Sequence, residues 1–352
     1  MAPLTRVRAN AEHVPQPIMA QYYKQRAVEP GTLLITEATF ISPAAGGMGN
    51  VPGIYNQAQI DGWKRVTQDV HENGSKIFMQ LWALGRAASA ETLKKELGTD
   101  GKVVSASDLA FEGGDKPTPL TEAEIDEYVK TYAQAAKNAI EAGFDGVEIH
   151  GANGYLLDQF LQDVSNKRTD KYGGSIENRA RFPLAVAKAV VEAVGAEKVG
   201  YRISPYSPFQ GMKMEDPKPT FEYLIKGLKE LKLVYLHVTE SRVTGNADVE
   251  GVEHIEPLVN LWTEDGSVAL VAGGYKPDSA RRAVDETYTG KNVLVVFGRW
   301  FISNPDLVFR LKNEVELIKY DRDTFYTPEK AQGYTDYEFS KEFLATQKKV
   351  AA

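Results

Sequence analysis

The chain has 352 residues, of which 43% are hydrophobic and 25% are charged, a balance typical of globular enzymes. Its formal net charge is −7 and its basic residues form no run, so partners such as nucleic acid or an anionic membrane are disfavoured. Cysteine is absent, which excludes disulfides, thiolate metal sites and cysteine nucleophiles. The first residues hold no apolar signal region and no stretch approaches a transmembrane span, so we expect a cytoplasmic protein.

Short β-branched runs alternate with amphipathic helices along the chain. The runs are continuously apolar, as expected for strands that are buried on both faces. In chain order the predicted strands are Met1–Leu4, Leu33–Glu37, Ile77–Trp82, Gly146–His150, Val199–Ser204, Val234–Val238, Val268–Ala272 and Val293–Phe297. The helices predicted between them are Gln57–Glu72, Glu122–Ala142, Arg179–Val194, Thr220–Leu231, Asp278–Asp285 and Pro305–Asn313.

Local signals mark the ends of two of these helices. Thr121 and Glu124 have the spacing of a capping box, and Gly143 supplies a C-terminal stop for the helix that they begin. Asn304 followed by Pro305 reads as an N-cap with proline at the first helical position.

Eight strand–helix alternations without an internal linker predict an α/β fold, a closed (β/α)8 TIM barrel, with residues 1–352 as a single domain. A doubly wound sheet is the alternative, but no G-x-G-x-x-G follows any predicted strand. Two loop insertions stand out, Ala83–Leu120 after the third strand and Glu240–Gly266 after the sixth. In a barrel both would lie over the reaction face.

The most informative stretch runs from Glu148 to Tyr155. His150 falls at the C-terminal end of its strand, where barrels place their reactive groups, and Asn153 and Tyr155 lie in the turn just beyond. An imidazole, an amide and a phenol around one cavity can hold a carbonyl oxygen and deliver a proton. The plainer interpretation is a strand cap with a packed tyrosine, and this stretch alone does not decide between them.

Cationic and glycine residues follow three other strands. Arg202 lies in an otherwise apolar strand, where an inward guanidinium requires a negative partner, either a structural acid or an anionic ligand. Gly273-Gly274 and Gly298-Arg299 follow strands seven and eight, where barrels commonly bind phosphate, although a turn and a surface charge would look the same. A phosphate-bearing cofactor whose ring gains negative charge, such as flavin mononucleotide (FMN), would use both arginines.

Three further strand-end residues have both a structural and a functional interpretation. The Gln80 carboxamide can donate to and accept from a pyrimidine-like edge, and Thr5 can add a hydroxyl. Both could equally bond the backbone. Trp82 is a candidate aromatic wall for the cavity, or a core tryptophan.

Taken together, these residues are recognisable: the chain resembles the Old Yellow Enzyme family of flavin-dependent ene-reductases, especially its yeast and fungal members. The likeness spans essentially the whole chain, and its central run from Gly146 to Phe182 is highly specific. The matching stretches are Pro3–Arg6, Thr36-Glu37, Gln80–Trp82, His150–Leu157, Tyr172–Arg179, Arg202–Pro205, Gly298–Pro305 and Tyr320–Tyr326.

The resemblance implies bound FMN, NADPH as hydride donor and a small-molecule α,β-unsaturated carbonyl substrate, in a monomer or homodimer. His150 and Asn153 match the pair that grips the substrate's carbonyl oxygen, and Tyr155 matches the proton donor. The residues that match cofactor-binding positions are Thr5, Ala38, Gln80, Arg202, Gly273, Gly274, Gly298 and Arg299. Those that would line the mouth of the site are Trp82, Phe209, Phe325 and Tyr326.

Two departures from the family pattern lead to further expectations. Family members carry a lead-in segment before the first strand, and this sequence begins within that strand, so we expect the segment to be missing and the barrel floor to be open. Gly274 stands at a position where related enzymes can carry a side chain, so a phosphate contact there would use the backbone only. Two alternatives remain to a general NADPH-dependent ene-reductase: a pathway-specific reductase or isomerase of secondary metabolism, and a truncated flavin-binding protein with little activity.

Overall fold

The computed structural model describes residues 1–244, 247–248, 251 and 253–350. Residues 245–246, 249–250 and 252 of the predicted Glu240–Gly266 insertion, and residues 351–352 of the predicted domain, lie outside the described residues. Parallel strands β1, β3, β6, β7, β8, β11 and β12 pair in chain order, and β2 pairs with β3. This sequential order is that of a barrel and excludes the doubly wound alternative, in which the strand order reverses.

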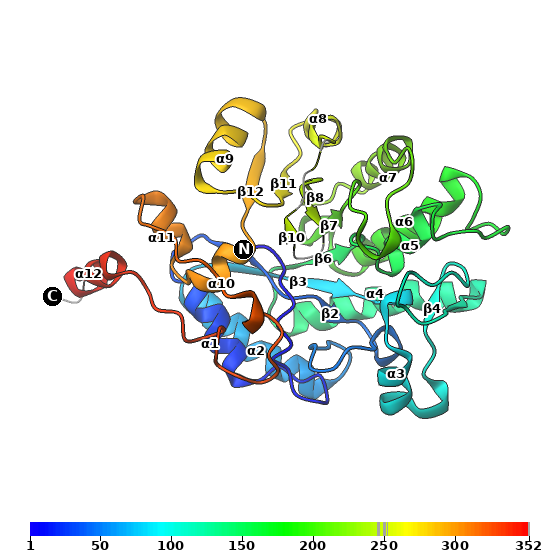
Figure 1. Ribbon diagram of the computed structural model, residues 1–352, viewed down its shortest axis with the longest axis horizontal. Helices are drawn as coiled ribbons and strands as arrows, with labels where there is room; N and C mark the ends of the chain where they lie inside the picture. The colour runs from blue at the N-terminus through cyan, green and yellow to red at the C-terminus, as the bar shows by residue number, and fades with distance from the viewer. Residues whose placement is uncertain (245–246, 249–250, 252, 351–352) are drawn as a thin grey trace.

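The strand bounds are β1 Leu33–Ile35, β2 Thr39–Phe40, β3 Lys76–Trp82, β4 Val104–Ser105, β5 Thr118–Pro119, β6 Gly146–His150, β7 Val199–Ile203, β8 Tyr235–Thr239, β9 Val243–Thr244, β10 Ala247–Asp248, β11 Ala269–Ala272 and β12 Val293–Val296. The helices are α1 Pro17–Arg26, α2 Gln57–Glu72, α3 Ala90–Leu97, α4 Glu122–Glu141, α5 Leu156–Leu161, α6 Ile176–Val194, α7 Lys218–Glu230, α8 Glu256–Thr263, α9 Pro277–Arg282, α10 Arg299–Ser303, α11 Leu307–Lys312 and α12 Lys341–Val350. Figure 1 shows the helices arranged around the strands, with the N-terminus beside the strands and α12 at the periphery.

The ring of strands is closed by the first two residues of the chain. The Met1 ammonium donates to the Leu33 carbonyl, the Ile35 N–H donates to the Met1 carbonyl, and the Ala2 N–H donates to the Phe297 carbonyl. Met1 and Ala2 therefore bridge β1 and β12. The prediction of a full strand over Met1–Leu4 is wrong, because Pro3 has no N–H with which to extend the ladder.

Of the two predicted helix starts that depend on a capping side chain, one is confirmed and the other is wrong. The capping box of Thr121 and Glu124 at the start of α4 is confirmed, and α4 ends just before Gly143, whose φ is +91°. The predicted start of a helix at Asn304-Pro305 is wrong, since Asp306 is the N-cap of α11. The Asn304 side chain instead binds the backbone of Ile318, through both its amide and its carbonyl oxygen.

Apolar side chains pack against both faces of the strands. The larger cluster lies between the strands and the surrounding helices, and a smaller cluster, which includes Phe78, Tyr235 and Leu270, occupies part of the barrel interior. Leu294 pairs with Leu270 and so shares its inward face, yet it is 55% exposed. The expectation of a missing lead-in segment stays a prediction.

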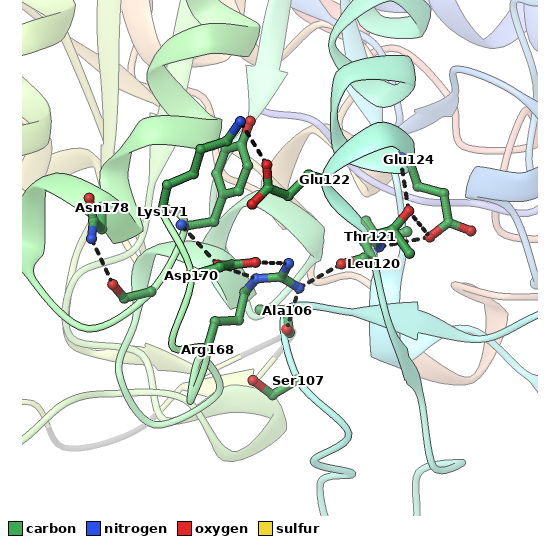
Figure 2. A network of polar contacts seen from close by, with 12 residues as sticks. Ala106, Ser107, Leu120, Thr121, Glu122, Glu124, Arg168, Asp170, Lys171 and Asn178 are labelled. Atoms are coloured by element: carbon green, nitrogen blue, oxygen red, sulfur yellow. Dashed lines mark hydrogen bonds and ion pairs between the residues drawn. The ribbon is translucent and has the colours of Figure 1, made fainter.

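The segment Ala83–Leu120 between β3 and α4 is fixed to the loop after α5. The Arg168 guanidinium donates to the carbonyls of Ala106, at 3.0 Å, and Leu120, at 2.6 Å, and pairs with Asp170 (Figure 2). These contacts hold the segment against the barrel beside the strand ends.

A second anchor ties the two ends of the chain together. Residues 320–334 form a C-terminal strap that is held by three buried arginines, Arg6, Arg8 and Arg26. All five N–H groups of Arg8 donate to carbonyls, four of them in the strap. The strap carries aromatic residues to the cavity described below, so the N-terminal segment sets their position.

Among the helices in the described part of the chain, none is long and apolar enough to cross a membrane.

Candidate active site

One cavity of about 940 Å³ opens at the C-terminal ends of the strands. Every site residue predicted from the sequence lines it, although these residues come from all parts of the chain. They are Thr5, Ala38, Gln80, Trp82, His150, Asn153, Tyr155, Arg202, Phe209, Gly273, Gly274, Gly298, Arg299, Phe325 and Tyr326. The fold therefore brings the predicted set together, as a barrel does with its strand ends.

His150 ends β6 and is 4% exposed. The backbone N–H of Ala152 donates to its Nδ1 at 3.4 Å, so we infer that Nδ1 is unprotonated and that Nε2 carries the hydrogen. Burial, aided by the positive charge of Arg202, lowers the pKa of His150 well below its ordinary value. The imidazole is therefore a neutral N–H donor beside the cavity.

Asn153 occupies a left-handed backbone conformation with φ +57°. Asparagine tolerates this region better than most residues, and the Asn153 N–H is secured by the Ser204 hydroxyl at 2.7 Å. The turn places Asn153 on the same cavity as His150. Two neutral donor groups thus face one space, an arrangement suited to an oxygen that gains negative charge.

Tyr155 is the N-cap residue of α5 and packs edge-on against two rings, Trp82 at 4.7 Å and His150 at 5.0 Å between centroids. Burial, and then the proximity of Tyr326, raises the pKa of Tyr155. The phenol therefore stays protonated at neutral pH and can act as a proton donor. Trp82 is 2% exposed and stacks on Phe40, so it forms the wall behind Tyr155 rather than an open mouth.

Beneath this turn lies a buried acid, Asp158. One of its oxygens accepts from the Gly154 N–H at 2.9 Å and the other accepts from the Gln162 amide at 2.8 Å. Gly154 lies between Asn153 and Tyr155, so Asp158 helps to hold both. Burial raises the pKa of Asp158 to about 7.

The raised pKa of Asp158 predicts a pH dependence of stability. Between about pH 4, the unfolded pKa, and about pH 7, the folded state retains a proton that the unfolded chain has released. The free energy of unfolding therefore falls as the pH rises through this window, by about 1 kcal/mol per pH unit from this group. Asp158→Asn removes this contribution. Urea unfolding at several pH values should give a flatter profile for Asp158→Asn than for the wild type or for the exposed control Asp278→Asn; parallel profiles would contradict the assignment.

The rim of the cavity is aromatic. Tyr326 and Phe325 come from the C-terminal strap, and Phe209 comes from the loop after β7. Tyr326 is 49% exposed, whereas Phe325 is buried. These rings leave an apolar entrance for an organic substrate.

The opposite part of the cavity combines neutral hydrogen-bonding groups with a cation. Gln80 projects from β3 and Arg202 from β7, Thr5 lies in the segment before α1, and Ala38 lies between β1 and β2. Glu37, which is fully buried, accepts from the Arg6 N–H and so fixes the backbone next to Thr5. Burial raises the pKa of Glu37 to about 7.

Glycines and a further cation line the end of the cavity beyond β11 and β12. Gly273 and Gly274 have φ values of +125° and +64°, which favour glycine. A side-chain carbon on Gly273 would lie 2.8 Å from the Glu240 Cβ. With Gly298 and Arg299, they form a surface where backbone can approach an anion closely.

These residues fit FMN. Five cationic residues line the cavity, and no acidic residue is among its described lining residues. The Arg202 Nε is buried and has no hydrogen-bond partner in the described residues, so it requires an acceptor that the chain itself does not provide there. The glycines and Arg299 suit a phosphate, and Gln80, Thr5 and Arg202 suit the polar edge of a flavin ring.

The sequence interpretation missed two cations on this cavity, Arg242 and Lys276. The Arg242 Nε donates to the Gly273 carbonyl at 2.7 Å and so supports the glycine turn. Arg242 follows Thr239, the last residue of β8, by three residues, so it lies beyond the C-terminal end of a strand. The rule that barrels place reactive groups at these ends could have found Arg242, but residues from 240 onward were interpreted only as an insertion.

Comparison with known proteins agrees with this geometry. The profile of the NADH:flavin oxidoreductase / NADH oxidase family matches residues 1–317. The chain is 55% identical over 345 residues to a chanoclavine-I aldehyde reductase of Penicillium roqueforti, covering 97% of this chain and 92% of that protein. It is 52% identical over 349 residues to an NADP-dependent oxidoreductase of Aspergillus flavus, with the same coverage.

Solved structures show the same fold. The Old Yellow Enzyme from Pichia sp. AKU4542 superimposes with a TM-score of 0.88 at 39% identity, covering 97% of this chain and 89% of that one. These similarities span nearly the whole chain. The chain therefore belongs to the NADH:flavin oxidoreductase / NADH oxidase family, as an Old Yellow Enzyme-type oxidoreductase whose cofactor is FMN.

Proposed function

We propose that this protein is an ene-reductase, which uses NADPH and FMN to reduce the C=C bond of α,β-unsaturated carbonyl compounds. The observation that carries the proposal is that His150, Asn153 and Tyr155 line the same cavity as Gln80 and Arg202. FMN, when bound, supplies the hydride chemistry between NADPH and the β-carbon of the alkene. Gln80, Arg202, Thr5 and the backbone at Ala38 would hold its ring, and Arg299 with the three lining glycines would hold its phosphate.

The chain's own residues would polarise and protonate the substrate. The N–H of His150 and the carboxamide of Asn153 bind the carbonyl oxygen, which makes the β-carbon electrophilic and stabilises the enolate that forms there. Tyr155 then transfers its phenolic proton to the α-carbon as a general acid. Because Tyr155 is kept protonated by burial, it is in the correct state to complete a net reduction.

The relatives support a narrower substrate class. One of them is named as an aldehyde reductase and another as NADP-dependent. We therefore favour NADPH over NADH and an α,β-unsaturated aldehyde over a ketone, in a pathway of secondary metabolism. The cationic lining of the cavity agrees with a doubly anionic phosphate group on the nicotinamide cofactor. A cytoplasmic location and a monomer or homodimer stay predictions from the sequence.

The test uses purified protein loaded with FMN under anaerobic conditions. NADPH should bleach the flavin absorption near about 450 nm, and cinnamaldehyde should then restore it, with the saturated aldehyde as product. NADH and 2-cyclohexenone in parallel reactions test the two preferences. Protein that binds no FMN, or that isomerises cinnamaldehyde without consuming NADPH, would contradict the proposal.

A further inference from the structure

A buried polar cluster lies inside the barrel, next to the cavity. Its members come from four adjacent strands: Gln80 on β3, Glu148 on β6, Arg202 on β7 and His237 on β8. Glu148 and His237 are completely buried, and neither lines the cavity. The reduction steps described above do not use either residue. Burying two ionisable groups completely costs free energy unless they bind each other well, so the presence of Glu148 and His237 needs a reason.

The register of the strands explains how these side chains meet. Glu148 pairs with Gln80 on one side and with Gly200 on the other. Gly200 has no side chain, and a carbon added there would lie 2.2 Å from the Tyr235 ring. The Tyr235 ring therefore fills the space that Gly200 leaves. Glu148 reaches past β7 to β8, where its Oε2 lies 2.8 Å from the His237 Nδ1.

The other oxygen of Glu148 fixes the orientation of Gln80. The Gln80 Nε2 donates to Glu148 Oε1 at 2.7 Å. An ionised carboxylate only accepts, so it binds the amide nitrogen of Gln80 and rejects the flipped carboxamide. The Gln80 carbonyl oxygen is therefore left as an acceptor for the ligand of the cavity.

The charges of the cluster support an ionised Glu148. Burial raises the pKa of Glu148, but the hydrogen bond from His237 and the positive charge of Arg202 oppose burial, and the pKa lies below its ordinary value. For His237, burial lowers the pKa more than Glu148 raises it, so the ring is a neutral donor through its Nδ1–H. Glu148 thus supplies one negative charge to balance the Arg202 guanidinium.

We propose that Glu148 is a positioning residue for the cofactor, which sets the orientation of Gln80 and balances the charge of Arg202. The proposal rests on the proposed function, since it takes Gln80 and Arg202 as contacts of the flavin ring. Glu148 touches neither the cavity nor the substrate and acts through these two residues. It therefore tunes both the affinity for FMN and the reduction potential.

The key variant is Glu148→Gln, which keeps the size of the side chain but removes the charge and accepts either orientation of Gln80. The dissociation constant for FMN should rise about tenfold, the scale of one lost hydrogen bond. The midpoint potential should become more positive by about 30 mV, a tenfold shift of the two-electron equilibrium. The sign follows because Arg202, freed of its counter-charge, stabilises the more negative reduced ring.

A second variant separates charge from position. Glu148→Asp keeps the charge but shortens the reach, so it should weaken FMN binding and leave the potential near that of the wild type. Asp306→Asn is the matched control, since Asp306 is a buried acid that pairs with Arg310 away from the cavity. The dissociation constant for FMN and the midpoint potential of Asp306→Asn should equal those of the wild type.

Each outcome bears on the proposal. Folded Glu148→Gln with the dissociation constant and potential of the wild type would overturn it. If Glu148→Gln does not fold, Glu148→Asp decides by its FMN affinity, and failure of both to fold while Asp306→Asn folds would show a purely structural role. A wild type that binds no FMN would instead reject the proposed function, so the two failures are distinguishable.

Discussion

Tyr155→Phe is expected to lower turnover with 2-cyclohexenone or cinnamaldehyde by about 10²–10⁴-fold, the range for loss of a positioned general acid. The phenyl ring retains the edge-on packing against Trp82 and His150, so the fold and the carbonyl donors stay in place. Only the proton is lost. The effect should therefore appear in kcat rather than in substrate binding.

Rapid mixing separates the two half-reactions and checks this assignment. Reduction by NADPH should proceed in Tyr155→Phe as in the wild type, whereas reoxidation by the alkene should slow. Tyr223→Phe, which removes a phenol from the surface, serves as the control. Full turnover of the alkene by Tyr155→Phe would show that Tyr155 is not the proton donor.

Replacing His150 by alanine is expected to lower kcat/KM for the alkene by about 10²–10³-fold, the usual cost of one donor to a developing oxyanion. Asn153→Ala should cost a similar factor. The double variant should lose less than the product of the two, because the donors bind one oxygen as a unit. His150→Asn, which keeps an N–H donor, should recover part of the loss.

The state of His150 gives this prediction a pH signature. Its pKa is lowered by burial, so the ring is neutral above that value and the donor does not titrate near neutral pH. Between pH 6 and pH 8, kcat/KM should therefore have the same pH dependence in the wild type and in His150→Asn. His71→Ala on the outer helix α2 is the control. If the double variant His150→Ala/Asn153→Ala kept the kcat/KM of the wild type, the role of both residues would be contradicted.

Seven barrel strands and half of the helices in the described residues could be predicted because their signals are local. An apolar run such as Gly146–His150 and a capping box such as Thr121 with Glu124 are complete within a few residues. The rule that barrel strands present reactive groups at their C-terminal ends then placed His150, Gln80 and Arg202 on one cavity.

What could not be predicted depends on partners far along the chain. Asn304 looks like a helix cap, but its side chain is taken by Ile318. Arg8 donates to Phe325, which is 317 positions away, and nothing in the local sequence indicates this contact. The pair of Glu148 and His237 likewise requires the strand register, because the two residues lie on β6 and β8, with β7 between them.

The most direct test that His150 and Asn153 bind the substrate's oxygen beside the flavin is a titration of the FMN-loaded protein with p-hydroxybenzaldehyde. A phenolate held by His150 and Asn153 beside an oxidised flavin donates electron density to it, which produces a long-wavelength charge-transfer band. We expect a saturable band in the wild type and its loss in the double variant His150→Ala/Asn153→Ala. A band of equal strength in that variant would show that His150 and Asn153 do not bind the oxygen.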